Sequence, residues 1–80
     1  MSDPQESWNE EKRSAWLYRA IAECERGTPR EALFRELAQA ADDQSEIWLD
    51  AIRQRGAPAP AAFRPDARTR LVARLVRLLG

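Results

Sequence analysis

The residues of this chain that could hold a metal ion or move a proton are few. The sequence of 80 residues contains no histidine and a single cysteine, Cys24, which excludes a Ser-His-Asp triad and the usual zinc sites. Any metal would have to be held by carboxylates. Glu11 recurs at helical spacing with the apolar residues of its segment, and Gln44 does the same later in the chain. These two side chains are therefore the candidates for a functional site.

Glu11 and Gln44 are expected to meet. If two helices turn back between Gly27 and Thr28, residues at equal height have numbers that add up to about 55. A carboxylate buried alone is costly, and an amide that donates a hydrogen bond to it relieves part of that cost. The simpler interpretation is a structural polar pair on the inner face of a hairpin. The alternative interpretation is a metal site that has lost some of its ligands.

Inward carboxylates of helix bundles also build carboxylate-bridged metal centres. In these centres two helices give one Glu each, and the other two give a Glu-x-x-His motif whose spacing puts both ligands on one face. Glu11 has the type of the single Glu. The place of the Glu-x-x-His motif reads Ala41-Asp42-Asp43-Gln44. Asp42 and Asp43 do not replace the missing ligand, because helix geometry turns them from that face by about 100° or more.

Helix start and stop signals position these residues. Asp3, which precedes a proline, is a typical N-cap, and Gly27 is a typical helix terminator. Thr28 and Glu31 then have the spacing of a capping box. The sequence therefore predicts helices of about 23 and 27 residues, the second reaching Gly56, that fold back as an antiparallel hairpin.

Each predicted helix carries an apolar arc that is wider than one partner helix can cover. The residues expected in the core or an interface are Trp8, Tyr18, Leu37 and Trp48. Trp16 falls off the main arc, which makes it either a dimer contact or a partly exposed ring. A chain of this length also builds a thin core. We therefore predict an all-α fold in which the hairpin is half of a four-helix bundle and a second copy completes it.

Charge and composition divide the chain into three parts. Residues 1–56, the hairpin, hold eight Lys or Arg and twelve Asp or Glu, whereas residues 57–65 are a linker of Pro and Ala. Residues 66–80 predict a basic amphipathic helix that either contacts a membrane surface or partner, or covers the hairpin with its apolar face. The arginines of its polar face are Arg70, Arg74 and Arg77. No aromatic residues alternate with them, so we expect no nucleic-acid partner.

The segments WNEEKRSAWLYRAIAECE and LFRELAQAADDQSEIWLDAIRQRGAPAP, followed by the Arg/Leu tail, resemble a known family. They look like the N-terminal ferritin-like, rubrerythrin-type domain that precedes the membrane part of vacuolar-iron-transporter-like proteins. The matching residues are Trp8, Glu11, Ala15, Leu17, Tyr18 and Arg19 in the first segment and Leu37, Ala38 and Trp48 in the second. The resemblance covers nearly all of the chain.

Two ligand positions depart from that family. Its second-helix Glu corresponds to Ala41 and its His to Gln44, so only Glu11 keeps a ligand type. The family's domain also continues into a second helix pair and a transporter. The resemblance implies half of a ferritin-like four-helix bundle in an iron-related setting, with iron or manganese as the metal and an incomplete set of ferroxidase ligands.

Two functions follow as expectations. The first is a ferritin-like module of iron handling or transport, with a degenerate metal site at Glu11 and a membrane transporter domain as partner. The second is a metal-free dimerisation or adaptor module associated with a membrane surface. The missing Glu-x-x-His argues against an enzyme in both. No apolar run approaches the roughly 20 residues that span a bilayer, and a lone cysteine fits a reducing compartment. We therefore expect a cytoplasmic location, including the cytoplasmic face of a membrane.

Overall fold

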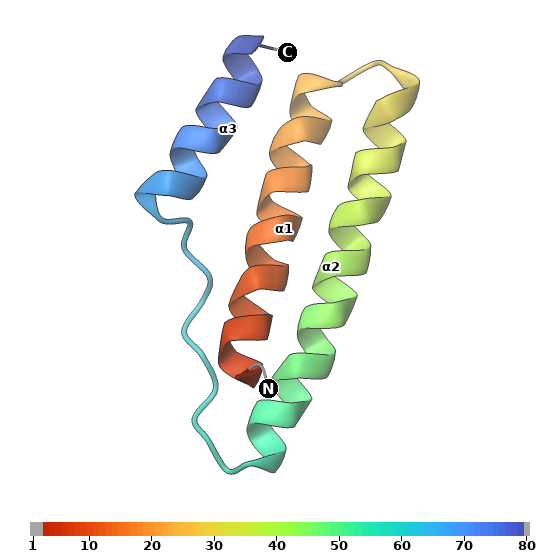
Figure 1. The fold of residues 1–80 in the computed structure, drawn as a ribbon. Coiled ribbons are helices and arrows are strands. Elements are labelled where there is room, and N and C mark those ends of the chain that lie inside the picture. The colour runs from red at the N-terminus through yellow and green to blue at the C-terminus, as the bar shows by residue number, and fades with distance from the viewer. Residues whose placement is uncertain (1–2, 80) are drawn as a thin grey trace.

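Three α-helices make up the computed structural model, which describes residues 3–79 (Figure 1). Helix α1 spans Pro4–Cys24, α2 spans Pro29–Gln54 and α3 spans Ala67–Leu79. Helices α1 and α2 form an antiparallel hairpin, and α3 packs on the other side of α1 without touching α2. The predicted all-α hairpin and C-terminal helix are confirmed, whereas its pairing with a second copy stays a prediction.

The ends of α1 follow the signals in the sequence. The Asp3 carboxylate accepts a hydrogen bond of 3.0 Å from the backbone N–H of Gln5, as an N-cap does, and Pro4 occupies the first helical position. The helix ends at Cys24. Gly27 follows with a φ of 84°, a left-handed conformation that favours glycine over residues with a Cβ.

The predicted capping box at the start of α2 is wrong. The Thr28 hydroxyl donates to the backbone oxygen of Glu25 at 2.7 Å and makes no cap bond to α2. The Glu31 carboxylate accepts from the backbone N–H of Gly27 at 3.1 Å instead of from that of Thr28. This hydrogen bond, together with one from Arg35, lowers the pKa of Glu31. The two side chains therefore brace the turn before the helix rather than the first turn of the helix.

Small side chains line the contact between α1 and α2. We call this set the alanine seam, and its members are Ala15, Ala22, Ala38, Ala41 and Ser45, all buried. Small residues at a helix contact allow the two backbones to approach closely. The larger apolar side chains therefore lie beside the seam, and Ile52 is the largest side chain that is fully buried.

This arrangement buries some of the apolar residues predicted for the core and leaves others exposed. Trp8 is buried, and Tyr18 and Trp48 are half-buried. Leu37 is 36% exposed, and two more apolar residues of α2, Leu33 and Ile47, are 52% and 58% exposed. A single hairpin thus leaves part of its apolar surface in water, as predicted from the width of the arcs.

The linker runs back along the hairpin and places α3 beside α1. The chain turns at Gly56 and passes beside α1 in an extended conformation, with Phe63 half-buried (Figure 1). Asp66 caps α3 by accepting a 2.8 Å hydrogen bond from the backbone N–H of Thr69, and the hydrogen bonds from Thr69 lower the pKa of Asp66. Helix α3 buries Thr69 and Ala73. A third helix does cover the hairpin, but the expectation that it does so with its leucine face is wrong.

Replacing Ala38 with leucine should lower the free energy of unfolding by about 1–3 kcal/mol, since the extra methylenes have no space between the helices. Urea unfolding followed by circular dichroism measures this. The matched control is Ala32→Leu, because Ala32 is an exposed alanine of the same helix. Equal stability of Ala38→Leu and the control would contradict a tight seam.

Candidate functional site

Glu11 and Gln44 line one shallow groove between α1 and α2. Its volume is about 270 Å³. The groove is lined by Glu11, Ser14, Tyr18, Leu37, Ala40, Ala41 and Gln44. The predicted register is therefore confirmed, since it placed Glu11 level with Gln44 and Tyr18 level with Leu37. The Tyr18 ring also lies near that of Phe34, with centroids 6.3 Å apart.

The expectation of a dry interior around this pair is wrong for the single chain. Gln44 is exposed and Glu11 is half-buried. The reason is the alanine seam, in which Ala41 and Ser45 are the residues of α2 that are buried next to Gln44. Gln44 is turned outward from that line, so its amide can be hydrated and needs no protein partner.

The groove does not offer a set of metal ligands. Within residues 3–79, no group of three or more His, Cys, Asp or Glu side chains is placed to hold a metal ion. Glu11 supplies one carboxylate, Ala41 supplies none, and Gln44 has only an amide. Divalent ions in proteins take several oxygen or nitrogen ligands at once, which one carboxylate does not provide.

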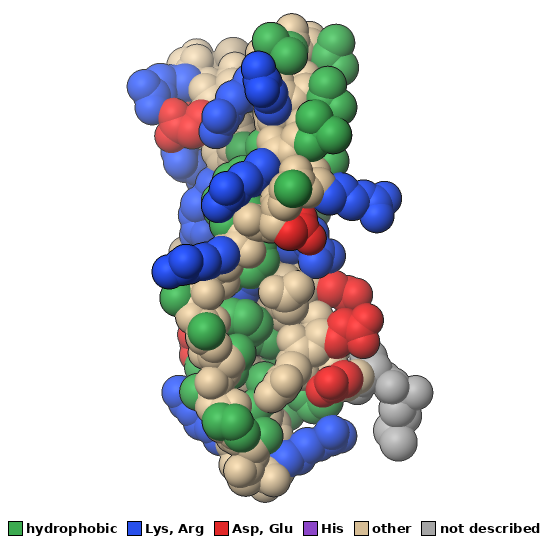
Figure 2. Space-filling model, turned by 90° about the vertical axis from the view of Figure 1, so that its left-hand side faces the viewer, with side chains coloured by type: hydrophobic (Ala, Val, Ile, Leu, Met, Phe, Trp, Pro, Cys, Tyr) green, Lys and Arg blue, Asp and Glu red, His purple; other side chains and the backbone are tan. Residues whose placement is uncertain are grey.

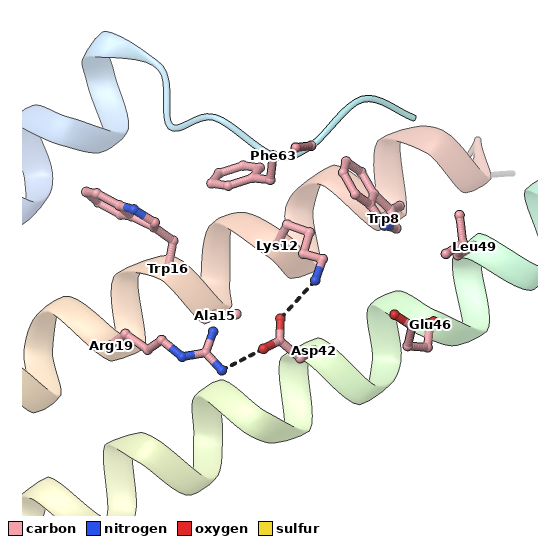
Figure 3. Close-up of a pocket in the computed structure, with 10 residues that line it drawn as sticks. Trp8, Lys12, Ala15, Trp16, Arg19, Asp42, Glu46, Leu49 and Phe63 are labelled. Carbon is pink, nitrogen blue, oxygen red and sulfur yellow. Dashed lines mark hydrogen bonds and ion pairs between the residues drawn. The ribbon is translucent and has the colours of Figure 1, made fainter. Parts of the chain in front are cut away.

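The other face of the hairpin carries a larger pocket with aromatic walls (Figure 3). Its volume is about 460 Å³. Trp8 and Trp16 of α1 and Phe63 of the linker form its apolar walls. Trp16 is half-buried here, which agrees with the partly exposed ring among its two predicted roles.

An ion-pair cluster lies at the floor of this pocket. The Asp42 carboxylate of α2 receives a hydrogen bond of 3.2 Å from Lys12 and one of 2.6 Å from Arg19, both of α1 (Figure 3). Burial raises the pKa of Asp42, but the hydrogen bonds from Arg19 and Lys12 outweigh it and leave the pKa below its usual value. The carboxylate is therefore charged at neutral pH, and it joins the two helices.

Sequence reasoning missed this cluster, although it placed Asp42 correctly away from the face of Glu11 and Gln44. The signal was available, because Lys12 and Arg19 are seven residues apart and so lie on one face of α1. Their charges also lie near the height of Asp42 in the predicted register. The pocket thus combines aromatic walls with charges that already neutralise one another.

The outer surface of α3 is a third candidate site. The predicted contact residues Arg70, Arg74 and Arg77 are exposed there, and so are most of the leucines of the helix. Figure 2 shows blue basic and green apolar side chains next to each other over this part of the surface. None of the helices described between residues 3 and 79 has the length and hydrophobicity to cross a bilayer.

No family model, curated protein or solved structure matches this chain. The resemblance to the domain of vacuolar-iron-transporter-like proteins therefore depends on the matching residues alone. Iron handling stays a prediction from that resemblance.

Replacing Asp42 with asparagine should lower the free energy of unfolding at pH 7 by about 1–2 kcal/mol, because Lys12 and Arg19 lose their shared partner. The pKa of Asp42 in the folded protein lies below the value of about 3.9 that an unfolded aspartate has. The stabilisation is therefore complete above that value and is lost as the pH falls through the folded pKa. Asp42→Asn should lose less stability than the wild type on acidification. Urea unfolding at a series of pH values measures both effects.

Asp43→Asn is the matched control for this substitution. Asp43 is exposed, and its carboxylate accepts one hydrogen bond, of 3.0 Å, from Gln39 of the same helix. We expect a change below about 0.5 kcal/mol at pH 7 and an acid response like that of the wild type. Equal effects of the two substitutions would show that Asp42 does not hold the helices together.

Proposed function

We propose that this chain is a metal-free helical assembly module whose hairpin pairs with a second copy. The observation that supports the proposal is one apolar face that the single chain leaves uncovered. We call it the open face, and it consists of Glu11, Tyr18, Leu33, Leu37, Gln44 and Ile47. The spacing of the α2 residues, from Leu33 to Ile47, places them along one side of the helix. Contiguous exposed apolar surface of this kind marks interaction sites.

The size of the open face suits a stable dimer. A standard interface removes about 800 Å² from each partner. That is about one seventh of the 5860 Å² that the chain exposes. A hairpin face as long as the 26 residues of α2 measures about 39 Å, and two adjacent helices are about 20 Å wide. Pairing over most of this face therefore reaches the area that a specific complex needs.

The polar residues of the open face favour a second copy over an unrelated partner. Glu11 and Gln44 lie within about one turn of the midpoints of their helices. A two-fold axis through the middle of the face would bring the amide of one copy close to the carboxylate of the other. The Gln44 amide can donate to the Glu11 carboxylate, so the pairing would satisfy groups that it buries. The same arrangement completes a four-helix bundle.

Ferritin-like iron handling is the second candidate function. Glu11 and Gln44, which correspond to ligand positions in the family resemblance, share a groove, and a dimer would bring two Glu11 carboxylates to its axis. Without Glu-x-x-His partners these carboxylates would hold a divalent ion weakly. The two candidates therefore differ in what a metal does to the folded chain.

The mass of the chain in solution tests the proposed pairing. We expect the 9.2 kDa chain to sediment as a species of twice that mass, and Leu37→Glu to sediment as a monomer, because a carboxylate would be buried in the interface. Sedimentation velocity over a range of concentrations measures this. Ala32→Glu adds the same charge at an exposed position of α2 that is turned away from the open face, and it should stay dimeric.

A wild-type monomer at high concentration would contradict assembly through this face. A dimer that Ala32→Glu disrupts as strongly as Leu37→Glu would place the interface elsewhere. Far-ultraviolet circular dichroism of both variants separates loss of pairing from loss of fold.

The effect of a metal ion on thermal stability distinguishes the two candidate functions. Mn(II) at millimolar concentration should leave the Tm of the wild type unchanged, because the groove has a single carboxylate. The double variant Ala41→Glu, Gln44→His restores the missing ligand types, and Mn(II) should raise its Tm by about 5 °C or more. Thermal unfolding with and without the metal measures both.

Adding Glu11→Gln to that double variant is the control, and it should remove the metal response. A rise in the Tm of the wild type that Glu11→Gln abolishes would support the iron-handling function instead.

A further inference from the structure

None of the leucine side chains of α3 is buried within the chain. Thr69 and Ala73 make the buried contact with α1. Five larger apolar residues are between 41% and 87% exposed. They are Leu71, Val72, Leu75, Leu78 and Leu79. An amphipathic helix normally turns such residues inward, so their position here requires another explanation.

The exposed residues of α3 form two adjacent stripes. At 100° per residue, Leu71, Leu75 and Leu78 share one side of the helix, roughly opposite the buried Thr69 and Ala73. The second stripe borders the first along the helix and consists of Arg70, Arg74 and Arg77. Figure 2 shows blue and green side chains side by side on the upper part of this side of the molecule.

The charge of this surface is strongly positive. Residues 57–80 contain five arginines and one acidic residue, Asp66. The Asp66 carboxylate is engaged at the N-terminus of α3, where it accepts from Thr69. None of the arginines of the second stripe has an acidic partner among the described residues of α3, because Ala67–Leu79 contains no Asp or Glu.

We propose that α3 binds the surface of an anionic membrane with these two stripes. The leucines would enter the boundary between headgroups and acyl chains, and the arginines would contact the lipid phosphates. Thirteen residues of helix are about 20 Å long and basic along one side, which suits a helix lying in the plane of the interface. An uncharged protein groove would also cover leucines, but it would leave the arginines without a partner.

The packing of α3 on α1 favours this binding. An isolated helix of this length is marginal in water, so a free peptide would lose conformational entropy as it folds on the membrane. Here the Asp66 cap and the contact with α1 hold the helix before it binds.

Cosedimentation of the full chain with vesicles tests the proposal. Vesicles of phosphatidylcholine with a third of phosphatidylserine should bind the wild type at least about tenfold more strongly than vesicles of phosphatidylcholine alone, and less so at high salt. Changing Arg70, Arg74 and Arg77 to Gln should weaken binding about a hundredfold, since each arginine near the surface contributes about fivefold. Changing Leu71, Leu75 and Leu78 to Ser should weaken it by about tenfold or more.

The matched control removes three arginines from other surfaces. Arg30→Gln, Arg53→Gln and Arg55→Gln, combined in one chain, cause the same change of net charge at exposed positions outside α3. This control should bind within about threefold of the wild type. Leu37→Glu, which tests the pairing of the hairpin, should still bind the vesicles, so failure of the one proposal can be told from failure of the other.

Three results would overturn the membrane proposal. One is a wild type that does not sediment with anionic vesicles. Another is a control that loses as much binding as the arginine variant, which would reduce the effect to net charge. The third is loss of self-association in the leucine variant without any vesicle binding, which would assign the leucines to a protein interface. Circular dichroism confirms that each variant keeps its helices.

Discussion

The contact of small residues between α1 and α2 is the constraint on which the rest of this structure depends. Alanine and serine fill the positions where the helices are closest, so larger side chains have no place between them. Each bulky residue must then lie on one of the two sides of the hairpin. One side becomes the open face with Leu37 and Gln44, and the other becomes the aromatic pocket with Trp8 and Trp16. Both candidate surfaces of the hairpin thus have the same cause.

A seam of similar small residues holds two helices close but does little to fix how far one is shifted along the other. The Asp42 cluster restricts this shift, because Lys12 and Arg19, which lie about two turns apart on α1, both bind the Asp42 carboxylate. Its carboxylate is protected enough for burial to affect its pKa, yet it has two cationic partners. Such a partly exposed cluster contributes modestly to stability.

Local signals and the register could be predicted from the sequence, whereas the choice of buried residues could not. Asp3, Gly27 and the level pair of Glu11 and Gln44 depend on short-range rules and on the length of one turn. The hydrophobic pattern predicted that Leu37 and the leucines of α3 would be covered. Amphipathic spacing shows that a helix has an apolar face, but it does not show what covers that face. Ala38 and Ser45 are buried because the backbones of α1 and α2 approach each other closely. Residue type alone does not reveal where this happens. The Thr28 hydroxyl could accept from a backbone N–H of α2 or donate to the turn before it, and in the structure it donates to Glu25.

The ring of Phe63 connects the position of α3 to the state of the aromatic pocket. It is the one aromatic residue of the linker, and it lies between Trp8 and Trp16 (Figure 3). The linker is therefore attached to α1 in its middle and not only at its two ends. A single phenylalanine in this way limits the positions from which the linker can start α3, and it keeps that helix beside α1.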